Sequence, residues 1–444
     1  MDINTPQSIT TETARPVAAT ERIKTIDIVR GVALLGILLM NIQGFGINWS
    51  ILDAIRRSPH DTADFYTYEV IGIFFAGTMR GLFSMLFGAG MILFTMNKKE
   101  TPGGVTVAEL YYRRLLLLVM FGVFNAYVLL WPGDILYFYG LAGMVLYPFR
   151  KTAAKWLFLI GILCIAIGIF KSQLGYNETR EKRAAYHETV KAENAGKKLT
   201  AEQQQARAIW LEIETRNQPD PERSDRTTRK IHSGYETVFN YFIPTNSNIE
   251  TWDIYHGIWD SLCMMFIGMA LLGIGFFSNK LSTSTYAMGL IIGYGIGIPI
   301  GWVMFSKGNL GSVNFGAYVD AYSVQHWALD DFKRLFLCLG HASFIMLVFR
   351  SRIIPWLMKG LANVGQMAFT NYLMQSIICT LFFYGYGLGY YNHLKYHQLY
   401  FVVGAVWVFQ LIFSAIWLRY YLFGPFEWLW RSLTYWKRQP MKKG

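Results

Sequence analysis

Long apolar stretches recur along the chain and are separated by shorter polar segments. About 20 consecutive apolar residues are needed to cross the roughly 30 Å of hydrocarbon in a bilayer. Windows of that length predict helices at 26–47, 70–97, 115–131, 135–149, 156–170, 260–279, 286–306, 334–349, 367–389 and 399–418. We therefore expect an all-α fold, a polytopic integral membrane helix bundle with about ten transmembrane helices.

The second apolar stretch is too long for one simple crossing and is interrupted by glycines. These are Gly72, Gly77, Gly81, Gly88 and Gly90. Small residues let helix backbones approach closely, and glycine-interrupted segments are typical of broken transmembrane helices. The pattern predicts a half-helix followed by a tightly packed full helix.

Composition also favours a bilayer location, because 53% of the residues are hydrophobic and only 16% are charged, which is few for a soluble chain. The net charge of +12 is expected to come from Lys and Arg beside anionic lipid, so membrane lipids are expected partners and nucleic acid is not. The cysteines have no paired or metal-type spacing, so we expect buried thiols and no metal site. They are Cys164, Cys263, Cys338 and Cys379.

Lys and Arg are concentrated in alternate connecting segments, which we assign to the cytoplasmic side. These segments lie at 15–24, 98–114, 150–155, 280, 350–359 and 419–443. The short segments between them hold few basic residues, so both termini are predicted to be cytoplasmic. Residues 1–22 are polar and lack the pattern of a cleaved signal peptide, so we expect a disordered cytoplasmic tail.

One long polar segment, 171–250, separates two groups of about five predicted spans. Within it, Thr200 and Gln203 have the spacing of a capping box at the start of a helix that ends before Pro219. The segment has too few apolar residues for an independent core, so we expect a helical, water-exposed extracytoplasmic insert, either a solvated spacer or a substrate-binding lid. The other parts are an N-terminal transmembrane bundle at 23–170, a C-terminal transmembrane bundle at 251–418 and a basic interfacial segment at 419–444.

Charged side chains within the spans are costly unless they face protein, water or a ligand, so they are candidate functional groups. Asp27 and Arg30 are three residues apart on one helix face. They form either a structural brace or a grip for an anionic group such as a coenzyme A phosphate. Arg80 either binds an anionic substrate or head group or pairs with Asp134 or Asp260. Asp134 either caps the helix that follows it or faces the same cavity as Arg80.

Asn371 and Gln375 are four residues apart on one face of the ninth span, where they either join helices through amide hydrogen bonds or contact a substrate. Glu427 and Arg431 have the same spacing in the segment 423–436, which is amphipathic and rich in tryptophan. We expect this segment to lie along the inner membrane interface and assign it no chemistry. A glycine-rich phosphate loop, an H-E-x-x-H motif and a G-x-S-x-G motif are absent from the sequence.

Five segments resemble the YeiB-type bacterial membrane family, a domain of unknown function (418). They are RIKTIDIVRG at 22–31, MNIQ at 40–43, LFSMLFGAG at 82–90, GQMAFTNYLMQS at 365–376 and FGPFEWLWR at 423–431. The resemblance extends over nearly the whole chain apart from the first residues and the insert. It implies a multi-pass protein of the bacterial cytoplasmic membrane and does not specify an activity.

That family in turn is distantly similar to transmembrane acyltransferases, which carry a first-helix arginine, ten intervening residues and a catalytic histidine. The same spacing here joins Arg30 to Asn41, about 16 Å apart on one helix face. Asparagine cannot accept a proton at neutral pH, so another group must supply the base. His341, near the middle of the eighth span, either supplies it or bonds a neighbouring helix. His60 and His256 are the other candidates for the base, and the alternative for both is a solvated loop residue.

Three functions fit these patterns. The first is an acyltransferase-like enzyme in which Arg30 holds a donor such as acyl-coenzyme A, and His341 or His60 is the base. The second is a transporter or exporter of a small or anionic substrate, and the third is a non-catalytic membrane scaffold. We favour the first, which requires the submerged polar side chains to surround one common hollow. The side chains concerned are Arg30, Arg80, Asn41 and His341. The substrate and the oligomeric state are not specified by the sequence.

Overall fold

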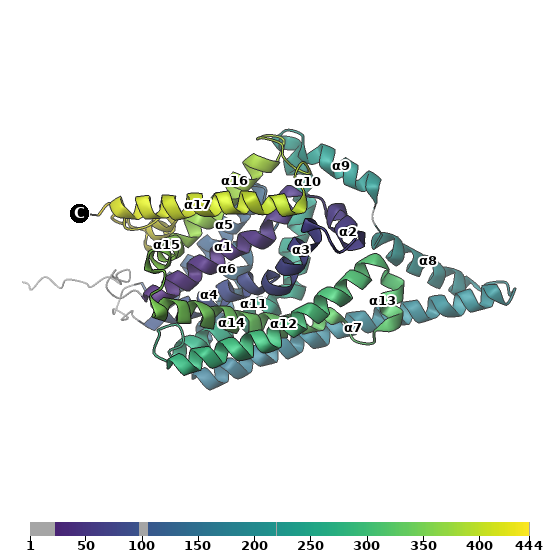
Figure 1. Cartoon of the computed structure of the whole chain (residues 1–444), viewed down its shortest axis with the longest axis horizontal. Helices are drawn as coiled ribbons and strands as arrows, with labels where there is room; N and C mark the ends of the chain where they lie inside the picture. Colours follow the sequence, from purple (N-terminus) through teal and green to yellow (C-terminus); the bar gives the residue numbers. More distant parts are fainter. Residues whose placement is uncertain (1–22, 97–104, 219, 444) are drawn as a thin grey trace, which may run out of the picture.

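The computed structural model describes residues 23–96, 105–218 and 220–443, except for the side chains of residues 253–256. Within these residues the fold is helical and contains no β-strand. The helices are α1 (Lys24–Gly46), α2 (Trp49–Arg57), α3 (Ala63–Val70), α4 (Thr78–Met96), α5 (Val107–Tyr127), α6 (Leu136–Leu146), α7 (Ala154–Asn194), α8 (Ala201–Arg216), α9 (Pro221–Ile231), α10 (Tyr235–Asn248), α11 (Ile254–Gly273), α12 (Thr283–Val313), α13 (Phe315–Ala321), α14 (Asp330–Ser351), α15 (Pro355–Gln366), α16 (Ala368–Phe383), α17 (Tyr396–Tyr420) and α18 (Pro425–Tyr435). Several long helices, among them α1, α7, α12 and α17, run roughly along the longest axis (Figure 1).

Within the described residues, six helices are long and apolar enough to cross a membrane, and the bent pair formed by α10 and α11 makes a seventh if it is one crossing. The six are α1, α3 with α4, α7, α12, α14 with the short 3-10 turn before it, and α17. The fold is therefore an all-α multi-pass membrane bundle, as the sequence predicts. The predicted count of ten differs because α5, α6 and α16 lie outside this group. The helix α6, for example, has 11 residues and is about 16 Å long.

The second predicted span is a broken helix, as its glycines indicate. The helix α3 continues through a π-helical turn at Ile71–Phe75, breaks at Ala76 and Gly77, and resumes as α4. Gly77 has a φ of +73°, a conformation that glycine adopts without the steric penalty of a side chain. The resumed helix packs tightly on α11, since a Cβ added at Gly88 would lie 2.1 Å from the carbonyl oxygen of Met265.

The helix α1 crosses α15 with the two backbones in contact. A Cβ added at Gly31 would lie 2.0 Å from the carbonyl oxygen of Leu361, and one at Gly365 would lie 1.8 Å from that of Asp27. Glycine is therefore required on both sides of the crossing. This contact fixes the first turns of α1, which carry Asp27 and Arg30, beside the junction between α15 and α16.

The described residues of the basic segments assigned to the cytoplasmic side lie at one end of the bundle, which we call the basic end. Arg350 donates hydrogen bonds to Asn279 and to the carbonyl of Leu281, and Arg113 donates to the carbonyl of Thr434 at 3.2 Å. In Figure 1 this is the end where the chain terminates, whereas α2, α8, α9 and α13 lie at the opposite end.

The polar insert continues the helix of the preceding span. The helix α7 has 41 residues and passes through the predicted boundary between residues 170 and 171 without a break. The capping box of Thr200 and Gln203 is present, and α8 ends at Arg216 and packs back along α7 (Figure 1). The main apolar side chain of the insert, Trp210, is fully buried in a small cluster that includes residues of α13. The insert thus packs on α13, within the C-terminal part of the chain, and its described residues form no large core of their own.

Candidate functional site

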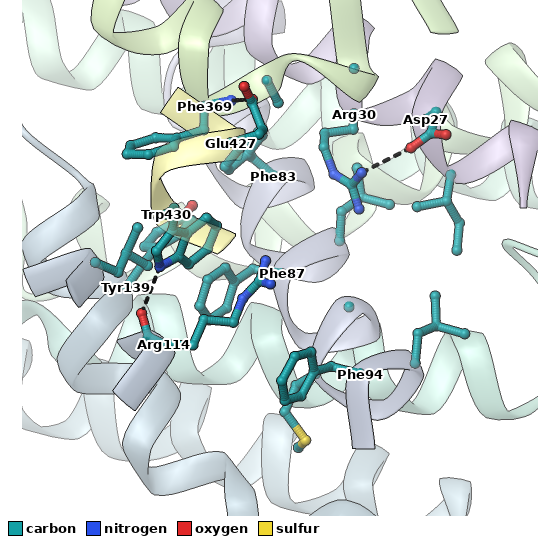
Figure 2. A pocket seen from close by; sticks show the side chains of 18 of the residues that line it. Asp27, Arg30, Phe83, Phe87, Phe94, Arg114, Tyr139, Phe369, Glu427 and Trp430 are labelled. Carbon is teal, nitrogen blue, oxygen red and sulfur yellow. Dashed lines mark hydrogen bonds and ion pairs between the residues drawn. The ribbon is translucent and has the colours of Figure 1, made fainter. Parts of the chain in front are cut away.

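A cavity of about 300 Å³ lies at the basic end, among α1, α4, α5, α6, α18 and the junction of α15 with α16 (Figure 2). Most of its wall is aromatic or aliphatic. These side chains include Phe83, Leu86, Phe87, Met91, Phe94, Leu115, Tyr139, Phe369, Tyr372 and Trp430. The charged side chains of the wall are Asp27, Arg30, Arg114, Glu427 and Arg431. An apolar wall with a few charged groups is suited to an amphiphilic ligand.

Asp27 and Arg30 form an ion pair on the wall of this cavity. Arg30 Nη1 donates to Asp27 Oδ1 at 2.9 Å, and the two side chains are 27% and 17% exposed. The spacing of three residues places both groups on one face of α1, and the crossing with α15 directs that face toward the cavity. The carboxylate therefore balances the charge of the guanidinium inside the site.

Arg114, from the first half of α5, lies on a different part of the wall. Its guanidinium carbon is 3.8 Å from the ring centre of Trp430 and 5.3 Å from that of Phe94. The indole Nε1 of Trp430 donates to the carbonyl oxygen of Arg114 at 2.9 Å, which fixes the two residues together. Figure 2 shows this pair on one side of the cavity and Asp27 with Arg30 on the other.

Glu427 is held at the start of α16. Its Oε1 accepts hydrogen bonds from the backbone N–H groups of Phe369 at 2.7 Å and Thr370 at 3.0 Å, and its Oε2 accepts from Thr370 Oγ1 at 2.5 Å. The carboxylate thus serves as an N-terminal cap supplied by another helix. Burial raises the pKa of this carboxyl above its usual value, and the hydrogen bonds oppose that rise.

Two buried tyrosines of the cavity wall bind polar groups that lie behind it. The hydroxyl of Tyr139 donates to the carbonyl oxygen of Arg80 at 3.0 Å and is 2.6 Å from Ser84 Oγ. The hydroxyl of Tyr372 donates to Asp134 Oδ1 at 3.3 Å. The cavity is therefore connected by hydrogen bonds to Arg80 and Asp134, although neither residue lines it.

Asp134 lies in the turn between α5 and α6 and binds only neutral groups. Its Oδ2 accepts from the backbone N–H of Tyr137 at 2.9 Å, which caps α6, and its Oδ1 accepts from Asn125 Nδ2 at 2.7 Å. Burial raises the pKa of this carboxyl to about 7, because its hydrogen bonds only partly offset the loss of water. The helix cap predicted for Asp134 is thus present, together with a contact to the cavity wall.

Arg80 belongs to a separate group of charges that we call the buried ion network. Its Nη2 lies 2.5 Å from Asp260 Oδ2, and Arg334 Nη1 lies 2.7 Å from the same oxygen. Arg334 also contacts Asp330 and Asp331, and Lys333 contacts Asp330. Three cations thus face three carboxylates, and pairing with Asp260, one of the two predicted interpretations of Arg80, is the arrangement present.

The candidate histidines lie away from the cavity. His341 Nδ1 is hydrogen-bonded to the hydroxyl of Tyr294, 2.8 Å away, and its Nε2 donates to the carbonyl oxygen of Phe74, 3.1 Å away. Because a carbonyl can only accept, the Nε2 proton is held there, and the ring joins α14 to α12 and to the π-helical turn. His60 is exposed and stacks on Phe65, and the side chain of His256 lies outside the described residues.

The remaining predicted residues also lie outside the cavity wall. Asn41 is three turns along α1 from Arg30. Asn371 Nδ2 donates to Ser414 Oγ at 2.9 Å, and Gln375 Nε2 donates to Gln410 Oε1 at 3.1 Å. These amides join α16 to α17, which is the structural interpretation of their spacing.

The cavity therefore contains Asp27 and Arg30 and does not contain the other predicted site residues. The common hollow expected around four polar side chains is not formed, since of these only Arg30 lines the cavity. Three further residues of the wall were not predicted. Arg114 was assigned to the basic inner segments and Glu427 to an interfacial helix, whereas Trp430 lies in the segment 423–431 that carries the family resemblance.

Comparisons with known proteins identify relatives without an assigned activity. The family model described as "Protein of unknown function (DUF418)" matches residues 271–437. The chain is 30% identical over 446 residues to the uncharacterized protein YxaH of Bacillus subtilis, covering 97% of this chain and 98% of that protein. It is 30% identical over 430 residues to the uncharacterized protein YeiB of Escherichia coli, covering 93% and 96%. No solved structure matches the chain.

Proposed function

Because the chain belongs to the DUF418 family, and because its cavity combines an apolar wall with guanidinium groups, we propose that it is an acyltransferase-like enzyme of the bacterial cytoplasmic membrane. It would take an acyl group from a cytoplasmic donor and transfer it to a lipid, glycan or small-molecule acceptor. The amphipathic cavity at the basic end is the observation that carries this proposal.

The composition of the wall supports an activated fatty acid as the donor. Phenylalanine and leucine side chains can enclose an acyl chain, and guanidinium groups bind phosphate oxygens through charge-assisted hydrogen bonds. Acyl-coenzyme A combines both features and is the donor we propose, bound as a substrate. The proposed mechanism uses no metal ion.

Tyr372 and Asp134 are the residues we assign to proton transfer. The acceptor hydroxyl attacks the donor carbonyl carbon, an ester bond forms, and the bond from that carbon to sulfur breaks. The acceptor proton passes to the oxygen of Tyr372 while the Tyr372 proton passes to Asp134. A proton then returns from Asp134 to the Tyr372 oxygen as Tyr372 gives its own proton to the leaving thiolate. A carboxyl pKa of about 7 suits this role near neutral pH. His341 is not assigned as the base because both of its ring nitrogens already form hydrogen bonds.

The proposal is tested with the full-length protein in lipid nanodiscs. Short-chain and long-chain acyl-coenzyme A are supplied, and thiol release is measured with and without lipid or glycan acceptors. Tyr372→Phe and Asp134→Asn are each expected to lower turnover by roughly a hundredfold or more. His60→Ala is the matched control and should leave turnover unchanged. No turnover with any donor, from protein whose melting temperature shows that it is folded, would overturn the proposal.

Transport of a small anionic substrate is the second candidate, and one observation favours it. The broken helix formed by α3 and α4 lies beside the buried ion network, and interrupted helices often form the binding sites of transporters. Accumulation of a labelled substrate in proteoliposomes, dependent on a proton or sodium gradient, would support transport. A protein that neither transfers acyl groups nor accumulates substrate would be a scaffold.

A further inference from the structure

The cations of the cavity wall differ in how their charge is balanced. Arg30 has the carboxylate of Asp27 at 2.9 Å. Arg114 forms no ion pair with a carboxylate of the described residues, and its guanidinium lies against the rings of Trp430 and Phe94. A guanidinium shielded by aromatic rings loses water, and this loss is costly unless an anion compensates for it. Of these two cations, Arg114 is therefore the one whose charge calls for an external anion.

Glu427 is the second carboxylate of this wall, beside Asp27, and it already forms hydrogen bonds elsewhere. Both of its oxygens accept hydrogen bonds from the first residues of α16. Turning this carboxylate toward Arg114 would leave those buried N–H groups without an acceptor, at the cost of uncapping the helix. Glu427 therefore stays at α16, where it acts on Arg114 from a distance without forming an ion pair with it.

Trp430 holds Arg114 in a defined position. The guanidinium lies over the indole ring at 3.8 Å, and the indole N–H is bonded to the Arg114 backbone. Stacking occupies the faces of the planar guanidinium and leaves its N–H groups at the edge, where they can bind two oxygens of one anion. Aromatic and aliphatic side chains adjoin this position along the wall.

We infer that Arg114, positioned by Trp430, recognises the anionic head group of an acyl-chain ligand, whose chain lies against the wall formed by Phe83, Leu86 and Phe87. The ligand class is an acyl chain with a phosphate or carboxylate head. That this ligand is the acyl donor rests on the proposed function. The inference assigns recognition of the negative charge to Arg114, where the sequence pattern had suggested Arg30. A soluble acyl thioester and a membrane fatty acid share this chemistry.

Binding is measured on the full chain in nanodiscs, without any requirement for turnover. The probes are palmitoyl-coenzyme A, palmitate and, as an uncharged analogue, monopalmitoylglycerol. Arg114→Gln is expected to weaken binding of the anionic probes by roughly tenfold or more and to leave binding of the uncharged analogue unchanged. Arg114→Lys should restore part of the affinity, and Trp430→Phe should weaken anion binding less than Arg114→Gln. Melting temperatures establish that each variant is folded.

The outcomes separate this inference from the proposed enzyme. Equal affinity of Arg114→Gln and the unaltered chain for both anionic probes would overturn the inference, as would an equal loss of affinity for the uncharged analogue. If Arg114→Gln weakens binding of palmitoyl-coenzyme A only, the ligand is a soluble thioester. If it weakens binding of palmitate only, the ligand is a membrane fatty acid. Binding that depends on Arg114 but leads to no acyl transfer would support the inference and overturn the enzyme.

Discussion

Two groups of charged side chains lie inside the bundle, and they differ in how their charge is balanced. In the buried ion network, Arg80 and Arg334 share the carboxylate of Asp260. At the cavity, Arg30 is paired with Asp27, but Arg114 lies against aromatic rings. The comparison indicates that balanced charges hold helices together, whereas an unbalanced cation beside an open volume is available to a ligand.

Removing a cation from the network should produce the largest effect on stability. The side chain of Arg334 is 6% exposed and contacts three carboxylates. Arg334→Met leaves those carboxylates with too little positive charge, so we expect the free energy of unfolding to fall by about 3–5 kcal/mol. Denaturant titration of the detergent-solubilised protein measures this. Arg216→Met, which breaks an exposed ion pair with Glu212, is the control and should change little. A similar small change in both variants would contradict the distinction between the network and the surface.

The packing that presents Asp27 and Arg30 can be disturbed without altering any charge. Gly365→Ala introduces a Cβ at 1.8 Å from the carbonyl oxygen of Asp27, so α1 and α15 must separate. We expect a loss of about 1–3 kcal/mol in the free energy of unfolding, together with weaker ligand binding. Gly404→Ala is the matched control because an added Cβ there meets no atom within 4 Å. Unchanged stability and binding in Gly365→Ala would show that the crossing does not position the ion pair.

Asp134 is a buried carboxyl whose hydrogen-bond partners are all neutral, so its charge is not balanced by a cation. Its pKa is raised from 3.8 to about 7, so between these values the folded protein keeps a proton that the unfolded chain has released. The free energy of unfolding should therefore fall as the pH rises from about 4 to about 7. Asp134→Asn should reduce this pH dependence, as measured by unfolding at a series of pH values. Acyl transfer, which needs the ionised carboxylate, should increase over the same range. An identical pH dependence in the variant would contradict the assignment.

The smallest effect is expected from Arg114 in the absence of ligand. Because its charge forms no ion pair with a carboxylate of the described residues, Arg114→Gln should change the free energy of unfolding by no more than about 1 kcal/mol. Adding an anionic acyl ligand should stabilise the unaltered chain more than the variant. A loss as large as that of Arg334→Met would place Arg114 with the structural charges and remove the contrast between the two regions.

Features set by neighbouring residues could be predicted from the sequence. The length of the apolar stretches predicted a helical membrane bundle, glycines predicted the break at Gly77, and the capping box predicted the start of α8. The i,i+3 spacing predicted the contact between Asp27 and Arg30. Each of these depends on a few consecutive residues and on general rules of helix geometry.

The cavity could not be predicted in the same way because its wall comes from distant segments. Arg114 and Trp430 are 316 residues apart, and Arg80 and Asp260 are 180 residues apart. The sequence shows that a charge is present within a span, but only the packing of the helices decides whether that charge meets a carboxylate. The sequence placed Arg80 within a span and Arg114 in a basic segment, but it could not show that Arg80 meets a carboxylate and that Arg114 meets aromatic rings.

The helix α7 has a consequence for measuring the orientation of the protein. Its 41 residues correspond to a rod about 60 Å long, roughly twice the thickness of the hydrocarbon layer. A continuous rod of this length must carry the loop between α7 and α8 well clear of the lipid. A label attached there would remain accessible in bilayers of different thickness, and a reagent that cannot permeate lipid would reach it from one face only.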